Sequence, residues 1–161
     1  MTGASVTTEP FPGLEPAVET IRIFCDGGSR GNPGPAGVGA VVLDVSQEPA
    51  KLLTTVSRTI GIATSNVAEY QALIDALEAA AHYGAARIEI RADSQLLIRQ
   101  LEGRYRVRNA GLQPLFRRAQ DLLRGYAQVD LEHVRRELNT EADALVNAAL
   151  DAAAALDSLG D

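Results

Sequence analysis

The 161-residue chain contains no tryptophan, and only 4% of its residues are aromatic; its single cysteine is Cys25. One cysteine excludes an internal disulfide framework and suits a reducing compartment, so we expect a cytoplasmic location. No apolar run approaches the roughly 20 residues that a membrane helix needs. The N-terminus has neither the basic nor the apolar segment of a secretion signal. These absences favour a globular domain with no membrane partner.

Negative charge is concentrated in the two tails, although the net charge of the whole chain is −6. Six acids and no base lie in residues 1–19 and 151–161, which leaves 15 acids against 15 bases in residues 20–150. All of these bases except Lys51 are arginine. Arginine suits bidentate phosphate contacts, and a GC-rich genome would produce the same bias. The overall acidity therefore allows a nucleic-acid partner, with modest and salt-sensitive affinity.

Periodicity predicts one α/β domain over residues 20–155, after a flexible N-terminal leader (1–19) and before a C-terminal tail (156–161). Three apolar segments joined by short turns predict an antiparallel meander. Two further strands and four helices complete a five-stranded mixed sheet flanked by helices. The strands are expected at 21–26, 37–45, 52–60, 87–92 and 128–134, and the helices at about 65–83, 94–102, 112–123 and 140–154.

The first predicted strand leads into one acid, Asp26, and then into GGSRGNPGPAG. The glycines and prolines are expected to end the strand there and to impose a tight turn. A carboxylate at the mouth of a buried strand is costly to desolvate unless something pairs with it. For clustered carboxylates the natural partner is a divalent cation.

Three more acids lie at junctions between predicted elements. Asp93 ends a strand as Asp26 does, and ligands of open α/β sheets gather outside the carboxyl ends of strands. Glu69 and Asp143 are each predicted in the first turn of a helix, where the helix dipole favours the ionised carboxylate. Each acid alone is typical of a helix cap or a dipole partner, but the four together indicate one site for a hard cation.

Four segments resemble, in order and spacing, the motifs of type 1 ribonuclease H across residues 20–150: DGGSRGNPGPAG, TSNVAEYQAL, RADSQLLIRQL and HVRRELNTEADALVNAAL. The chain looks most like the compact branch found in archaea and actinobacteria. The resemblance implies a ribonuclease H-like fold. It also implies an endoribonuclease that hydrolyses the RNA strand of RNA/DNA hybrids and leaves 3′-hydroxyl and 5′-phosphate ends.

The same resemblance assigns the catalytic and metal-binding acids as Asp26, Glu69, Asp93 and Asp143. It implies two Mg²⁺ (or Mn²⁺) ions clamped on the scissile phosphate. Acids packed so closely repel one another, so we expect at least one of them to be partly protonated without metal. Substrate contacts are implied for a further set, each of which could instead be a turn former or a helix cap: Gly31, Asn32, Thr64, Ser65, Asn66 and Gln95.

Two features depart from the family pattern. Many relatives have a mobile histidine before the last helix, but the corresponding HVRRELN segment is too short for that loop. Arg136 is our candidate to replace it as a fixed cation, with Arg135 as the close competitor and His133 in a structural role. The Lys- and Trp-rich basic protrusion of some relatives is also missing. Residues 99–108, with four arginines and a tyrosine, are either a phosphate-contact patch or a solvated segment.

Two other functions are weighed against the nuclease. A non-catalytic ribonuclease H-like module would bind nucleic acid without cutting it, but a pure binder gains nothing from clustered acids near phosphates. A nucleotide phosphate loop fails because GGSRGNPGPAG lacks the Gly-Lys-Ser/Thr ending and opens no helix. Activity on double-stranded RNA, activity on a lone ribonucleotide and fusion to a longer polypeptide are left open. A monomer is the default.

Overall fold

A computed structural model describes residues 17–160, so most of the leader predicted over residues 1–19 lies outside the described residues. The element order is strand, strand, strand, helix, strand, helix, helix, strand, helix, as the sequence predicts. The bounds are β1 Thr20–Ser29, β2 Gly34–Asp44, β3 Lys51–Ala63, α1 Ser65–Ala80, β4 Arg87–Ala92, α2 Gln95–Leu101, α3 Gln113–Leu123, β5 Gln128–His133 and α4 Thr140–Gly160, with short 3₁₀ turns at Ala81–Tyr83 and Arg136–Leu138.

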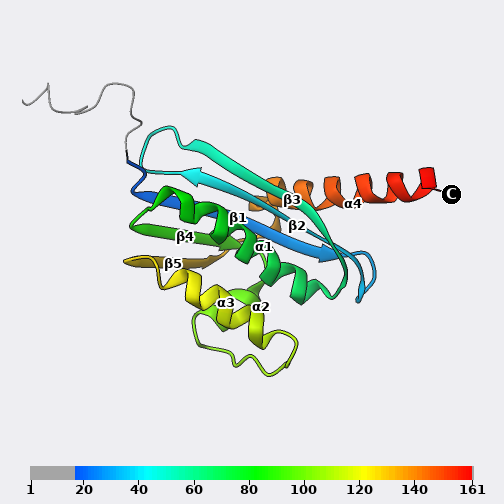
Figure 1. The fold of residues 1–161 in the computed structure, drawn as a ribbon. Helices are drawn as coiled ribbons and strands as arrows, with labels where there is room; N and C mark the ends of the chain where they lie inside the picture. The colour runs from blue at the N-terminus through cyan, green and yellow to red at the C-terminus, as the bar shows by residue number, and fades with distance from the viewer. Residues whose placement is uncertain (1–16, 161) are drawn as a thin grey trace, which may run out of the picture.

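The five strands form one mixed sheet in the order β3-β2-β1-β4-β5. β1 is central: it pairs antiparallel with β2 and parallel with β4. Figure 1 shows α1 across one face of the sheet and α4 across the other. The predicted meander followed by two more strands is therefore confirmed.

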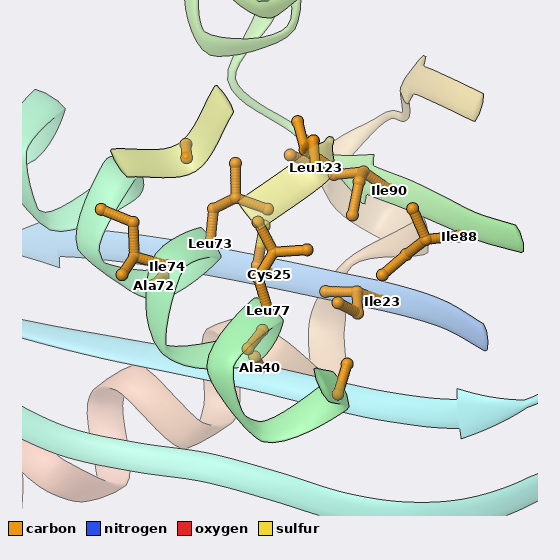
Figure 2. Close-up of a cluster of buried hydrophobic side chains, with 14 of the residues drawn as sticks. Ile23, Cys25, Ala40, Ala72, Leu73, Ile74, Leu77, Ile88, Ile90 and Leu123 are labelled. Atoms are coloured by element: carbon orange, nitrogen blue, oxygen red, sulfur yellow. The ribbon is translucent and has the colours of Figure 1, made fainter. Parts of the chain in front are cut away.

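The main core lies between α1 and the sheet. Ile23 and Cys25 of β1 pack with Leu73 and Leu77 of α1, as Figure 2 shows. Cys25 is only 1% exposed, and burial raises the pKa of its thiol. Strand alternation predicts that this thiol points away from Asp26, and its place in the core agrees.

β1 does not end at Asp26, and here the sequence prediction is wrong. The strand continues to Ser29 because Gly27 and Gly28 pair with Val38 and Gly37 of β2. The turn is confined to residues 30–33, and Gly31 within it has a φ of 102°, in the left-handed region that favours glycine. Gly27 therefore has another role, which the packing of α1 reveals.

The domain extends further toward both ends of the chain than the sequence predicts, where the structure describes them. Val18 packs against the core, and the Glu19 carbonyl accepts hydrogen bonds from the backbone N–H groups of Ala86 and Arg87. α4 continues through Gly160 instead of stopping near residue 154, and Figure 1 shows its end projecting beyond the sheet. Its alanine-rich run at 152–155 explains the extension, since alanine is the best helix former. Within residues 17–160, no helix is both long and apolar enough to cross a bilayer.

Candidate active site

Asp26 and Asp93 are brought together by the parallel pairing of β1 with β4. The last pair in this register is Cys25 with Ala92, and each acid is the next residue of its chain. The two carboxylates therefore leave adjacent strands at the same edge of the sheet. The expectation that the two acids would be neighbours is confirmed, although only Asp93 follows the end of its strand and Asp26 lies within β1.

Gly27 and Gly39 allow one helix to approach each face of the sheet beside Asp26: α1 at Gly27 and α4 at Gly39. A Cβ on Gly27 would lie 2.2 Å from the carbonyl carbon of Ala68, the α1 residue before Glu69. Gly39 is the partner of Asp26 on β2, and a Cβ there would lie 2.3 Å from the carbonyl oxygen of Ala142. Asp143 follows Ala142. Because Gly27 and Gly39 have no side chains, α1 and α4 can come close enough to bring Glu69 and Asp143 next to Asp26 and Asp93.

The four acids line one pocket of about 290 Å³. Its other lining residues come from the end of β1 and the turn after it, the start of α1, the segment after β5, and α4. They are Gly27, Gly28, Ser29, Arg30, Ser65, Arg136, Val146, Asn147 and Leu150. Four acids separated by up to 117 positions in the sequence thus face one cavity.

Asp26 holds its proton far more tightly than an ordinary aspartate. Burial raises its pKa from 3.8 to about 7, and the nearby Asp93 and a hydrogen bond shared with Asp143 add to the rise. Burial likewise raises the pKa of Glu69 from 4.5 to about 7, although a hydrogen bond from Ser94 opposes the rise. The expected partial protonation of the metal-free cluster is therefore confirmed for these two acids.

Glu69 is not in the first turn of its helix, contrary to the sequence prediction. α1 begins at Ser65, and its N-cap is Thr64, whose hydroxyl accepts from the Val67 N–H at 3.2 Å. Glu69 therefore lies in the second turn, where the helix dipole acts weakly on it. The expectation that the dipole keeps this acid ionised is wrong, because burial dominates.

Asp143 does lie in the first turn of α4, as predicted. Its backbone N–H bonds to the Asn139 carbonyl at 3.2 Å. The Asn139 side chain, only 1% exposed, instead donates to the carbonyl oxygen of Cys25 at 2.9 Å. This bond ties the start of α4 to the residue before Asp26, so it sets the distance between the two acids.

The raised pKa values of Asp26 and Glu69 predict that the metal-free protein loses stability as the pH rises. Both acids ionise in the unfolded chain near pH 4 but in the folded chain near pH 7. The stabilisation is therefore fully present below pH 4 and is lost progressively up to pH 7. Solvent screens the charges in this open pocket and reduces the effect. We expect the unfolding free energy to fall by about 2 kcal/mol between pH 4 and pH 7.

Urea unfolding in a chelating buffer at pH 5 and pH 8 measures this loss. The Asp26→Asn/Glu69→Gln double variant is the matched comparison, because its pocket has lost two titrating groups. Its unfolding free energy should change less between the two pH values than that of the wild type. Equal pH dependence in both proteins would contradict the raised pKa values.

The pocket suits a hard cation by its donor set, which consists of carboxylate oxygens. The half-buried Asp26 carboxyl has three acidic neighbours, so a cation would relieve repulsion that a proton now relieves. Among the described residues, however, no three such side chains are already arranged as ligands of one ion. Side-chain rotation would have to complete the ligand set.

The predicted substrate residues surround the pocket without all lining it. Asn32 accepts a hydrogen bond from the Ser65 N–H at 3.1 Å, which joins the β1–β2 turn to the start of α1. Ser65 lines the pocket, whereas Asn66 and Gln95 are exposed in the first turns of α1 and α2, outside the lining set. Thr64 is occupied as the cap of α1.

Arg136 reaches the pocket from the turn after β5. Its Nε lies 3.8 Å from Asp93 Oδ2, and its side chain is 85% exposed. Arg135 is not among the pocket-lining residues. His133 is exposed at the end of β5 and pairs in the sheet with Ala92, next to Asp93.

Two of the four arginines of residues 99–108 line a second hollow, of about 610 Å³, between the α2–α3 connection and α3. Arg104, Arg106 and Arg117 line it, together with Tyr105, which is 51% exposed. An accessible ring and three cations in one hollow are the ingredients of a phosphate-contact patch.

Sequence reasoning gave no pocket role to four residues that shape the pocket, although it predicts Asn139 as the cap of the last helix: Arg30, Ser94, Asn139 and Asn147. Ser94 had a local signal, since it directly follows Asp93. Asn147 had one too, because it lies four residues after Asp143 on a helix. Its amide donates to the Asp143 carbonyl at 3.1 Å and lies 3.4 Å from that side chain's Oδ2. The role of Asn139 depends on a contact 114 positions away.

Comparison with known proteins agrees with the fold. The profile of the reverse transcriptase-like family matches residues 24–149. Ribonuclease HI of Halobacterium salinarum is 46% identical over 131 residues, which cover 81% of this chain and 64% of that protein. The bifunctional protein Rv2228c of Mycobacterium tuberculosis is 45% identical over 134 residues, 83% of this chain and 36% of that protein. The chain thus spans less than two thirds of these relatives' length.

Two solved structures extend the agreement over whole domains. The N-terminal ribonuclease H domain of Rv2228c has a TM-score of 0.77 and 42% identity, covering 81% of this chain and 98% of that one. LC11-RNase H1, solved in complex with an RNA/DNA hybrid, has a TM-score of 0.76 and 40% identity, covering 83% and 98%. The sheet order and the four-acid pocket therefore define a ribonuclease H-like α/β domain. Within that class, the chain belongs to the type 1 ribonuclease H family.

Proposed function

We propose that this chain is an endoribonuclease that hydrolyses the RNA strand of RNA/DNA hybrids and leaves 3′-hydroxyl and 5′-phosphate ends. The observation that carries the proposal is the convergence of four acids on one pocket, two of them with pKa values raised to about 7. A binding module has no use for such a cluster beside phosphates. One chain supplies all four acids, so a monomer would suffice for catalysis.

Asp26, Glu69, Asp93 and Asp143 would hold two Mg²⁺ or Mn²⁺ ions. Bound there, the ions supply an activated water for attack on the phosphorus and charge stabilisation of the leaving 3′-oxygen. Asp26 is central among the four, since Asp93, Asp143 and Glu69 all act on its pKa. Ser94 orients Glu69 through its hydroxyl, and Asn139 fixes α4 against β1.

The hybrid would lie along the turn of residues 30–33 and the starts of α1 and α2. Gly31 and Asn32 present a turn without a bulky side chain, so a sugar–phosphate strand can approach closely. Thr64, Ser65, Asn66 and Gln95 place polar groups where a shallow minor groove lined with 2′-hydroxyls would pass. Double-stranded RNA has the same groove shape and is the second substrate to test.

The proposal is tested with a hybrid labelled on its RNA strand, incubated with the protein and Mg²⁺ or Mn²⁺. Cleavage of the RNA strand is expected, with no cleavage of a DNA duplex of the same sequence. We expect the products to be substrates for a ligase, which requires a 5′-phosphate and a 3′-hydroxyl. A protein that binds the hybrid with either metal and never cuts it would instead be a binding module.

Replacing Arg136 by alanine should lower turnover more than replacing His133. The Arg136 guanidinium lines the pocket beside Asp93 and can hold a phosphate or the leaving group. His133 is outside the pocket lining, so His133→Ala should keep kcat within about twofold, whereas Arg136→Ala should lower it roughly tenfold or more. Single-turnover rates on the labelled hybrid decide between them, and the reverse ranking would return the role to the histidine. Arg135→Ala, tested alongside, separates the two neighbouring arginines.

A further inference from the structure

Arg30 is an exposed arginine that lies at the rim of the acidic pocket yet has a defined position. Its Nη2 lies 2.7 Å from Asp151 Oδ1 and 3.3 Å from Asn147 Oδ1, both on α4. Its side chain keeps 44% of its surface exposed. It therefore lines the pocket and faces solvent at the same time.

The backbone beneath Arg30 is fixed by the turn. Its N–H donates to the Pro35 carbonyl at 2.8 Å, which closes the turn after β1. Its carbonyl oxygen lies so near Gly34 that a Cβ there would approach to 2.2 Å. A guanidinium carried on such a base is preorganised, which lowers the entropy lost when it binds a ligand.

The bonds of Arg30 lead back to a catalytic acid. Asn147 accepts from Arg30 through Oδ1 and donates through Nδ2 to the carbonyl of Asp143, close to that residue's carboxylate. One amide thus joins a surface cation to the pocket. Both contacts to α4 use Nη2, and the planar guanidinium carries five N–H donors in all.

We propose that Arg30 binds a backbone phosphate of the nucleic-acid strand that enters the pocket, with Asp151 as its carboxylate stand-in when no substrate is bound. This rests on the proposed function. The pocket is rich in acids, and a polyanionic strand can enter only if cations at the rim offset the repulsion. A guanidinium binds carboxylate and phosphate oxygens alike, so a phosphate can take the place of Asp151 without rearrangement of the turn.

Asp151 is suited to such an exchange because its side chain is 69% exposed. An ion pair this open contributes little stability. An incoming phosphate can therefore displace Asp151 from Arg30, while Asn147 keeps the guanidinium near Asp143. Asn147 is in this sense a positioning residue.

The test compares Arg30→Gln with Asp151→Asn, and uses Arg118→Gln as the matched control. Arg118 is likewise about half exposed (52%) and paired with one acid, Glu78 at 3.0 Å, but lies on α3 and outside the pocket lining. Steady-state cleavage of the hybrid is measured at several salt concentrations. Binding of the uncut hybrid is measured by fluorescence anisotropy without divalent metal.

A lost phosphate contact should raise KM with kcat little changed, because the contact is made equally in the ground state and the transition state. We expect Arg30→Gln to raise KM and Kd about tenfold, and to reduce the slope of log Kd against log salt by about one. Asp151→Asn should leave KM unchanged or lower it, since it removes a competitor for Arg30. Arg118→Gln should match the wild type.

Two outcomes would overturn the proposal. If Arg30→Gln and Asp151→Asn weaken binding equally, Arg30 only fastens the turn to α4. If Arg30→Gln leaves the salt slope unchanged, it contacts no phosphate. A wild type that fails to cut the hybrid would defeat the proposed function, and the anisotropy comparison would still decide the role of Arg30.

Discussion

Asp26→Asn should reduce cleavage of the RNA/DNA hybrid at least about a thousandfold. Asp93, Asp143 and Glu69 all raise the pKa of Asp26, so Asp26 is central to the cluster. Each ion held in the pocket would therefore depend on it. Asparagine keeps the shape but removes the charge that a divalent cation requires. Losing several kcal/mol of transition-state stabilisation corresponds to three or more powers of ten in rate.

Binding of the hybrid should survive the same substitution. Removing a negative charge from the pocket weakens its repulsion of phosphate, so Kd without divalent metal should stay the same or fall. Asp130→Asn is the control for loss of an aspartate, because Asp130 is 56% exposed on β5 and pairs with Arg91 at 3.3 Å. Its cleavage rate should equal that of the wild type. Undiminished cleavage by Asp26→Asn would falsify the catalytic assignment.

Three of the four acids could be predicted from the sequence because each of them lies where a local signal changes. Asp93 follows a short β-rich run and precedes the serine that caps α2, so β4 was located with its observed bounds. Asp26 precedes a glycine pair, and Asp143 follows a polar cap position. Junction residues combine periodicity with turn and cap chemistry, and these signals are strongest over a few neighbouring residues.

The surroundings of the acids could not be predicted in the same way. Three polar residues in a row could cap α1, and the choice of Thr64 depends on how the chain leaves β3 at Ala63. That choice moved Glu69 from the first turn to the second and let burial control its pKa. The ion pair of Arg30 with Asp151 joins residues 121 positions apart. Contacts of this length depend on the finished fold.

The glycine pair after Asp26 shows why one sequence signal can have two causes. Gly-Gly predicts a turn, because glycine tolerates backbone conformations that other residues avoid. In the structure both glycines lie in β1, and Gly27 serves the close approach of α1. Periodicity along one segment carries no information about which helix will cross it, so only the packing could distinguish the two causes.

Gly27→Ala should be among the most destabilising single substitutions in this domain. The new Cβ would meet the carbonyl carbon and oxygen of Ala68 at 2.2 Å and the Glu69 nitrogen at 2.5 Å, all of them backbone atoms of α1. Because no side-chain rotation can relieve this overlap, the helix must move away from β1. We expect a loss of about 3 kcal/mol of unfolding free energy and a fall in Tm of roughly 10 °C. The displaced α1 carries Glu69 away from Asp26, so residual activity should require more metal.

Gly28→Ala is the matched control, one residue further along the same strand. Its Cβ would meet only the Val146 Cγ1, at an ordinary 3.9 Å. Both variants remove the same glycine entropy from the unfolded chain, so their difference measures the overlap with α1 alone. Thermal unfolding in a chelating buffer should place Gly28→Ala within a few degrees of the wild type and Gly27→Ala well below it. Equal Tm values for the two variants would mean that α1 yields at no cost, and that Gly27 does not set the distance between Asp26 and Glu69.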